Sequence, residues 1–382
     1  MLALEYRPSL PRYLAARALR GRTEPPLRLI ETEPPLPPAP DWVPLAPRLS
    51  GICGSDQALL AAGASLYLAP LTSTPFVPGH EIVATVTAGE ARGRRVVVQP
   101  ALGCAPRGLT HPCPECAAGR GALCRAVTEG RVGPGLQIGF CQQTGGGWSE
   151  GLIAHRSQLH EVPETLADEE AVLIEPLACA LHAVARAALA PEARVAVIGC
   201  GTLGLLAIAA LRERHPDVSI LAVAKHPGQE LAARRAGADH VCPPARLHLD
   251  GARITGARRL LGPGGRELLL GGFDAVLDCV GSGGSLEGAI GAVRPRGVVA
   301  LAGMPAALRV DLALAWQREV EIRGAYGYER EFEQALALAP RLKLGRLVAA
   351  AFPLREFRRA LASAPQEARH GRPKTVFDLR QR

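Results

Sequence analysis

Short apolar runs alternate with segments of helical periodicity between residues 194 and 301. The run RVAVIGCG is followed by the helical stretch TLGLLAIAALRER, and SILAVA, FDAVLDCVG and GVVALAG are separated in the same way. Strands that alternate with helices pair in parallel, with helices on both faces of the sheet. The sequence therefore predicts an α/β fold with a parallel sheet in this part of the chain.

The first of these strands runs into the glycine-rich turn GCGTLG at residues 199–204. Glycines let the backbone approach a pyrophosphate, and the N-terminus of the following helix stabilises its negative charge. A lone GxGxxG can also be a tight turn without a ligand, but the strand–turn–helix setting favours a dinucleotide. The expected cofactor contacts are Gly199, Gly201, Thr202, Leu203 and Gly204.

The end of the second strand bears on the choice between NAD and NADP. NAD enzymes usually carry a carboxylate there for the ribose hydroxyls. This chain instead reads Ala224-Lys225-His226, and Asp217 lies before the strand. Because a cation can pair with a 2′-phosphate, Lys225, with His226 as a helper, predicts NADP rather than NAD. The alternative is that Lys225 is a solvated loop residue.

Two short motifs supply candidate ligands for a catalytic metal: GICGSD at 51–56 and VPGHE at 77–81. Zinc accepts the Cys53 thiolate and the His80 imidazole, and a catalytic site adds a third ligand and an open position. Glu81 and Glu175 both qualify as that ligand. Glu175 lies in an otherwise apolar helix, where an unpaired carboxylate is costly. A lone cysteine or histidine is more often structural, but the combination beside a dinucleotide motif favours a metal site.

A second cluster of ligands consists of Cys104, Cys113, Cys116 and Cys124 in a loop rich in glycine and proline. Four thiolates satisfy a closed tetrahedral zinc site that orders the loop. Two disulfides and a zinc-ribbon module for nucleic acid are the alternatives. Ten cysteines without an evident secretory leader favour metal binding in a reducing compartment, so we expect a cytoplasmic protein.

The charge pattern argues against nucleic acid as a partner. The net charge is +8, but the arginines are scattered along the chain rather than gathered in one block. No apolar run is long enough for a membrane span. We therefore expect neither a nucleic-acid nor a membrane partner, and 382 residues suit about two domains.

In chain order, the motifs GICGSD, VPGHE, the cysteine loop, GGGWSEG, IEPLACALHA, GCGTLG, DCVGS and AFPLREFRRAL cover nearly the whole sequence. Together they resemble the zinc-dependent alcohol, polyol and threonine dehydrogenase branch of the medium-chain dehydrogenase/reductase superfamily. The resemblance implies a GroES-like, mainly β catalytic domain of residues 1–166, with a zinc lobe at 104–124, which resumes at 326–382. A Rossmann domain of residues 167–325 would lie between the two parts in sequence, with zinc and nicotinamide in the cleft.

The resemblance also implies roles for single residues. Cys53, His80 and either Glu81 or Glu175 would bind the catalytic zinc, Ser55 would start a proton relay, and Asp56 would be the carboxylate beside the metal. The chain departs from the family pattern in three places. Thr110 occupies the usual position of the first lobe cysteine, with Cys104 six residues earlier; Ala58 replaces a relay histidine; and the acid at the second strand is missing.

These features predict an enzyme that transfers hydride between an alcohol or polyol, or its carbonyl product, and NAD(P). Small-molecule substrates and a homodimer or homotetramer are expected. One alternative is a metal-free NADPH-dependent quinone or enone reductase on the same fold. The other, from a different class, is a zinc-stabilised regulatory protein that senses the nucleotide.

Overall fold

The computed structural model describes residues 1–9, 11, 13–15 and 24–381, and the chain divides into two compact units. Unit 1 comprises Met1–Glu175, Gly327–Pro365 and Lys374–Arg382, and unit 2 comprises Pro176–Tyr326 and Gln366–Pro373. The units differ from the expected ranges in two places. The first boundary between the two units lies after Glu175 rather than after residue 166. The segment Gln366–Pro373 belongs to unit 2 because its backbone packs directly on Gly228.

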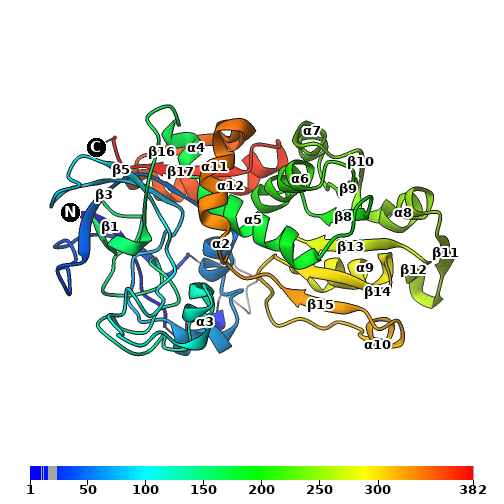
Figure 1. Ribbon diagram of the computed structural model, residues 1–382, viewed down its shortest axis with the longest axis horizontal. Coiled ribbons are helices and arrows are strands. Elements are labelled where there is room, and N and C mark those ends of the chain that lie inside the picture. Colours follow the sequence, from blue (N-terminus) through cyan, green and yellow to red (C-terminus); the bar gives the residue numbers. More distant parts are fainter. Residues whose placement is uncertain (10, 12, 16–23, 382) are drawn as a thin grey trace. The chain divides into compact units, whose positions relative to one another are not determined.

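Unit 2 contains a six-stranded sheet in which all neighbouring strands are parallel. The order is β10 (His240–Cys242), β9 (Ser219–Val223), β8 (Arg194–Ile198), β13 (Phe273–Asp278), β14 (Val293–Leu301) and β15 (Glu321–Gly324). Figure 1 shows β9, β8, β13, β14 and β15 side by side in that order. The chain starts in the middle of the sheet and winds to both edges, which confirms the doubly wound parallel sheet.

Helices follow the strands as the sequence predicts. They are α6 (Thr202–Arg214), α7 (Pro227–Ala236), α8 (Leu247–Thr255) and α9 (Gly283–Ala292). Side chains at alternate strand positions point to one face of the sheet, and there Ile198 and Val276 share a buried cluster with Ile290 of α9. Helix α6 packs against β8 and α7.

Two features of the chain go beyond the sequence prediction. An antiparallel ribbon, β11 (Arg258–Leu261) with β12 (Glu267–Leu270), interrupts the alternation, and the GPGG segment forms its turn. The apolar helix that carries Glu175 is α5 (Ile174–Ala187), and a separate short helix, α4 (Asp168–Ala171), precedes it. Pro176 has no N–H to donate to the preceding turn, so it suits the first turn of a new helix and not the middle of a long one.

Unit 1 is built on a mainly antiparallel sheet with the order β16-β17-β3-β4-β5-β7, and β6 also pairs with β3. The strands are β16 (Val348–Phe352), β17 (Lys374–Asp378), β3 (Trp42–Gly51), β4 (Ile82–Val86), β5 (Arg95–Val98), β6 (Leu152–His155) and β7 (Leu159–Glu161). The pair β1 (Leu2–Tyr6) and β2 (Leu27–Glu31) forms a separate small sheet. The proline-rich segment 22–50 thus supplies β2 and β3, except for residues 22 and 23, which lie outside the described residues.

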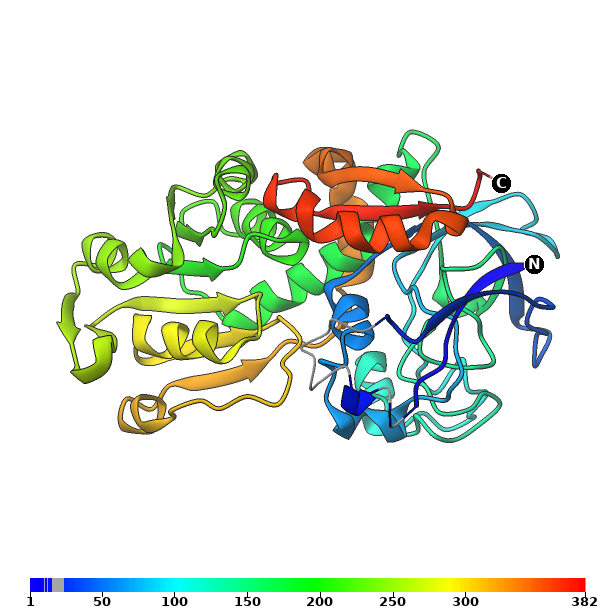
Figure 2. The same ribbon diagram turned by 180° about the vertical axis from the view of Figure 1, so that it is seen from behind.

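The C-terminal strand β17 brings the end of the chain beside β3. Figure 2 shows α12 (Phe357–Arg369) alongside β16 and β17, and Phe357, Phe352 and Phe377 share one buried cluster. Helix α11 (Glu331–Leu342) precedes β16, and the short α10 (Ala313–Gln317) precedes β15 in unit 2. None of the helices in the described part of the chain combines the length and apolar character that crossing a bilayer requires.

Candidate active site and metal centres

Cys53 lies two residues after the end of β3 and is the N-cap of helix α2 (Gly54–Leu60). Its N–H donates to Oδ2 of Asp56 at 2.9 Å, and Asp56 is buried. This bond fixes the turn that carries the thiol, and the helix N-terminus favours the thiolate form. Ser55 lies half-buried between these two residues in the sequence. The structure thus places the GICGSD motif at the end of a central strand.

His80 and Glu81 follow a turn that only glycine fits. Gly79 has φ +98°, and a Cβ there would lie 2.5 Å from Cδ1 of Trp148. The His80 side chain is buried, and its Nδ1 lies 3.6 Å from Oδ1 of Asp56, too far for a hydrogen bond. Neither atom has a hydrogen-bond partner among the described residues.

The sulfur of Cys53, a ring nitrogen of His80 and a carboxylate oxygen of Glu81 all lie within 4.8 Å of one another. Thiolate, imidazole and carboxylate form a donor set that zinc accepts. Nδ1 of His80 and Oδ1 of Asp56 are buried polar atoms without a hydrogen-bond partner among the described residues, which suits a site that binds a cation. The residues of this cluster therefore fit a zinc ion.

A buried lysine holds Glu81. Nζ of Lys374 in β17 donates to Oε1 of Glu81 at 2.6 Å and also to Oε2, and both side chains are 1% exposed. A Cβ at Gly51 would collide with this carboxylate, so glycine is required at that position. Burial lowers the pKa of Lys374, but the charge of Glu81 outweighs it and raises that pKa above its usual value.

Lys374 was not among the candidates from the sequence, although a signal existed. It is one of only three lysines in the chain, and it lies in a strand whose five residues are all buried. A charged residue in such a strand needs a partner of opposite charge.

Glu175 lies in the first turn of α5 and is buried. Burial lowers the pKa of His80, but Asp56, Cys53 and Glu175 together raise it well above its usual value. The carboxylate of Glu175 therefore adds negative charge to the surroundings of His80.

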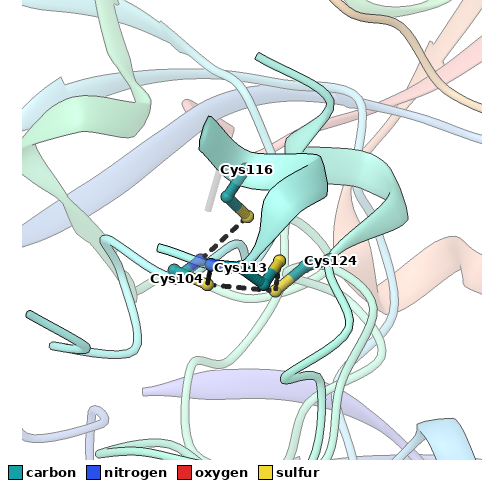
Figure 3. Close-up of side chains that lie close together, drawn as sticks. All are labelled: Cys104, Cys113, Cys116 and Cys124. Carbon is teal, nitrogen blue, oxygen red and sulfur yellow. Dashed lines mark hydrogen bonds between the residues drawn. The ribbon is translucent and has the colours of Figure 1, made fainter. Parts of the chain in front are cut away.

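Four cysteines converge in the loop between β5 and β6 (Figure 3). The distance between the sulfurs of Cys104 and Cys124 is 3.6 Å. The distance between the sulfurs of Cys113 and Cys124 is 4.0 Å. A tetrahedral zinc with Zn–S bonds of about 2.3 Å requires sulfurs about 3.8 Å apart. All four are free cysteines, so the expected residues come together with the spacing of a metal site and not of two disulfides.

Backbone N–H groups point at these sulfurs. The N–H of Cys104 donates to the sulfur of Cys116, and the N–H of Cys113 to that of Cys104. Burial raises the pKa of the Cys113 thiol, but N–H donors, including that of Arg125, and neighbouring thiols lower it to about 6. Such donors stabilise thiolates, the form that binds metal.

The cofactor turn lies between β8 and α6 in unit 2. Gly199 has φ +93°, and a Cβ at Gly204 would lie 1.8 Å from the carbonyl oxygen of Gly199, so strand and helix can approach only with glycine at both positions. A Cβ at Gly201 would meet nothing within 4 Å. Gly201 is the N-cap of α6 and offers no side-chain cap, so the first N–H groups of the helix, at Thr202, Leu203 and Gly204, can face a phosphate.

The second strand ends as expected, without a carboxylate. β9 stops at Val223, Lys225 is exposed, and His226 is the N-cap of α7. The N–H of Lys225 donates to Oε1 of Gln229 at 3.2 Å. This bond ties the backbone of Lys225 to the first turn of α7, beyond the end of β9.

Two family profiles match two separate segments of the chain. The profile of the alcohol dehydrogenase GroES-like domain matches residues 39–164, and that of the zinc-binding dehydrogenase matches residues 202–341. Among characterised relatives, sorbitol dehydrogenase of Bacillus subtilis (strain 168) is 26% identical over 297 residues, 75% of each chain. L-idonate 5-dehydrogenase of Vitis vinifera is 27% identical over 300 residues, 75% of this chain and 73% of the relative.

Solved structures share the fold. A protein of Sinorhizobium meliloti 1021 described as a zinc-binding dehydrogenase, with NADP bound, superposes with a TM-score of 0.74 at 23% identity and covers 98% of this chain and 99% of its own. 2R,3R-butanediol dehydrogenase from Bacillus subtilis superposes with a TM-score of 0.72 at 22% identity, with 99% of each chain covered. The chain therefore belongs to the zinc-dependent alcohol and polyol dehydrogenase branch of the medium-chain dehydrogenase/reductase superfamily, a branch of oxidoreductases.

Proposed function

We propose that the protein transfers hydride between an alcohol or polyol, or the corresponding carbonyl compound, and NADP(H) in preference to NAD(H). The observation that carries the proposal is the convergence of Cys53, His80 and Glu81 in one buried cluster. Relatives named for sorbitol, L-idonate and D-xylulose support a polyhydroxylated substrate.

In this proposal Cys53, His80 and Glu81 hold a zinc ion, with Glu175 as a nearby carboxylate. Zinc bound there supplies a Lewis acid that lowers the pKa of a substrate hydroxyl. Asp56 fixes the turn of Cys53 through its N–H and lies beside the His80 ring, so it orients two of the ligands. We assign Glu81 rather than Glu175 as the direct carboxylate ligand, and the position of its oxygen within the cluster of ligand atoms supports this assignment.

We assign to Ser55 the role of accepting the proton that the substrate hydroxyl loses. A serine hydroxyl can accept a proton on one lone pair while it donates its own, so it can pass a proton to solvent. Ala58 lies one turn further along α2 and has no group that titrates. Water therefore takes the place of a relay histidine in the last step of proton release.

The four cysteines of the loop hold a second, structural zinc. Their sulfurs and the N–H groups that point at them satisfy a closed four-thiolate site. Such a site leaves no open position for substrate, so its role is to order a loop that has few regular elements of its own.

Lys225 carries the proposed preference for NADP. Its charge, the absence of a carboxylate after β9 and the N-terminus of α7 all favour a 2′-phosphate. We expect Lys225→Ala to lower kcat/KM for NADP about tenfold and to leave that for NAD nearly unchanged. Lys343→Ala, at another exposed lysine, is the matched control. A native enzyme that uses NAD better than NADP would contradict the assignment.

The catalytic role of the metal is tested by turnover with a panel of secondary alcohols and polyols, followed by NAD(P)H absorbance. His80→Ala is expected to abolish turnover and to leave NADPH binding, measured by fluorescence, intact. Full activity in metal-free protein would instead favour the quinone or enone reductase. Nucleotide binding without turnover of any substrate would favour the regulatory protein.

We propose further that the enzyme is cytoplasmic and acts as a homodimer or homotetramer. The ten free cysteines support a reducing compartment. Strand β15 ends the sheet of unit 2, and its outer edge is available for pairing with a second copy. Sedimentation equilibrium that gives the monomer mass of 40.1 kDa at micromolar concentration would contradict the assembly.

A further inference from the structure

A fully buried arginine lies inside the cysteine loop. Arg107 belongs to the segment between Cys104 and Cys113 that makes this loop longer than the family pattern, and its side chain is 0% exposed. The guanidinium donates only to backbone carbonyl oxygens: those of Leu102 at 3.1 Å, Glu129 at 2.8 Å, Val132 at 3.0 Å, Gly133 at 3.3 Å and Gly135 at 2.6 Å.

These bonds satisfy the donors of Arg107 but do not neutralise its charge. Within the described part of the chain, its hydrogen-bond partners are all backbone carbonyls and no carboxylate forms an ion pair with it. A buried cation without a counter-charge is costly even when its N–H groups are bonded. The buried neighbours that supply negative charge are sulfurs, and the exposed carboxylate of Glu129 makes a smaller contribution. Burial lowers the pKa of Arg107, and Cys141, Cys124 and Cys104 oppose that effect most strongly.

Two of these three sulfurs, those of Cys104 and Cys124, belong to the four-cysteine cluster (Figure 3). Four thiolates around one Zn²⁺ carry a formal charge of about −2, which is itself unfavourable in a buried loop. The loop would therefore contain a buried cation, Arg107, that no carboxylate pairs with. This cation would lie near a metal centre with excess negative charge. Each charge offsets the cost of burying the other.

We propose that Arg107 is the buried counter-cation of the four-thiolate zinc centre and increases the retention of zinc in this loop. The inference rests on the structural zinc of the proposed function and does not involve the hydride transfer itself. The segment between Cys104 and Cys113 thus supplies a charge in addition to lengthening the loop.

The test measures zinc release from the full chain at neutral pH, with a chelating chromophore as the acceptor. His80→Ala serves as the background, so that the zinc measured is that of the loop. We expect Arg107→Met to speed zinc release about 10- to 100-fold, the range for partners that support metal ligands. Arg125→Gln is the matched control because it removes an equal charge from the same loop at a side chain that is 65% exposed. Its release rate should stay within about threefold of the background.

A second pair of variants separates charge from hydrogen bonding and also serves if Arg107→Met does not fold. Arg107→Lys keeps the charge and loses the planar fork, whereas Arg107→Gln keeps N–H donors and loses the charge. The proposal expects Arg107→Lys to retain zinc longer than Arg107→Gln when circular dichroism shows equal folding. Release from Arg107→Gln that is as slow as from Arg107→Lys would overturn it, and so would equal release from Arg107→Met and Arg125→Gln. If the His80→Ala protein contained no zinc at all, the structural zinc itself would be refuted.

Discussion

The ion pair between Lys374 and Glu81 leads to a quantitative prediction. Replacing Lys374 by Met keeps a chain of similar length and removes the charge, so that Glu81 is left buried with no cation in zinc-free protein. Both side chains are 1% exposed, so solvent does not screen the loss. Removal of one partner from a buried pair costs about 3–5 kcal/mol. We expect a decrease of that size in the free energy of unfolding of zinc-free unit 1.

Two further variants test the cause of this decrease. Lys374→Met combined with Glu81→Gln removes both charges, so most of the lost stability should return. Lys343→Met removes an exposed lysine and should change the free energy of unfolding by no more than about 0.5 kcal/mol. Zinc bound beside Glu81 would replace the missing cation, so the effect of Lys374→Met should be smaller in zinc-loaded protein.

Denaturation in urea, followed by tryptophan fluorescence, measures these differences. Trp42 and Trp148 are buried in unit 1, whereas Trp316 of unit 2 is 84% exposed, so the emission change reports mainly on unit 1. A decrease below about 1 kcal/mol for Lys374→Met, or no recovery in the double variant, would refute the argument that this pair stabilises unit 1 by mutual charge compensation.

Three other predictions concern the cofactor turn, a buried carboxylate and pH. Gly204→Ala, whose Cβ would lie 1.8 Å from a carbonyl oxygen, should destabilise unit 2 by about 3 kcal/mol in calorimetry. Gly201→Ala, whose Cβ meets nothing within 4 Å, should keep the melting temperature and weaken NADPH binding. Asp168→Asn should lower the free energy of unfolding by about 2 kcal/mol, because the buried Asp168 carboxylate bonds three arginines that are themselves 23–37% exposed. Burial raises the pKa of Asp378, but hydrogen bonds from Arg380 hold this pKa below its usual value. The stability that this carboxylate contributes is present above its unfolded pKa of about 3.9 and is lost as pH falls through the lower folded value. Asp378→Asn should therefore flatten the acid limb of a stability–pH curve, and an unchanged limb would contradict the assignment.

The parallel sheet of unit 2 could be predicted because its signals are local. Each strand of this sheet is a short apolar run, each following helix has its own periodicity, and the glycines of residues 199–204 mark the turn between them. The β11–β12 ribbon was missed because its leucine-rich strands interrupt that alternation and pair only with each other.

The ligands in unit 1 could be predicted as residue types, but their surroundings could not. Lys374 and Glu81 are 293 residues apart in sequence, and the pairing of β3 with both β17 and β4 brings them together. The burial of Arg107 could likewise not be predicted, because nothing in the sequence distinguishes it from the other arginines. Only the structure shows that five carbonyl groups enclose it. Contacts of this kind depend on the tertiary fold, which periodicity and spacing do not encode.

Zinc stoichiometry, measured by mass spectrometry of the purified protein, tests the two metal centres most directly. We predict two zinc ions per chain in the native protein and one in His80→Ala, which retains the four-cysteine site. Cys113→Ser should lose the other ion and, where the chain still folds, keep the one bound by Cys53 and His80. A fully active protein with no zinc, or a His80→Ala protein that still holds two ions, would contradict the account.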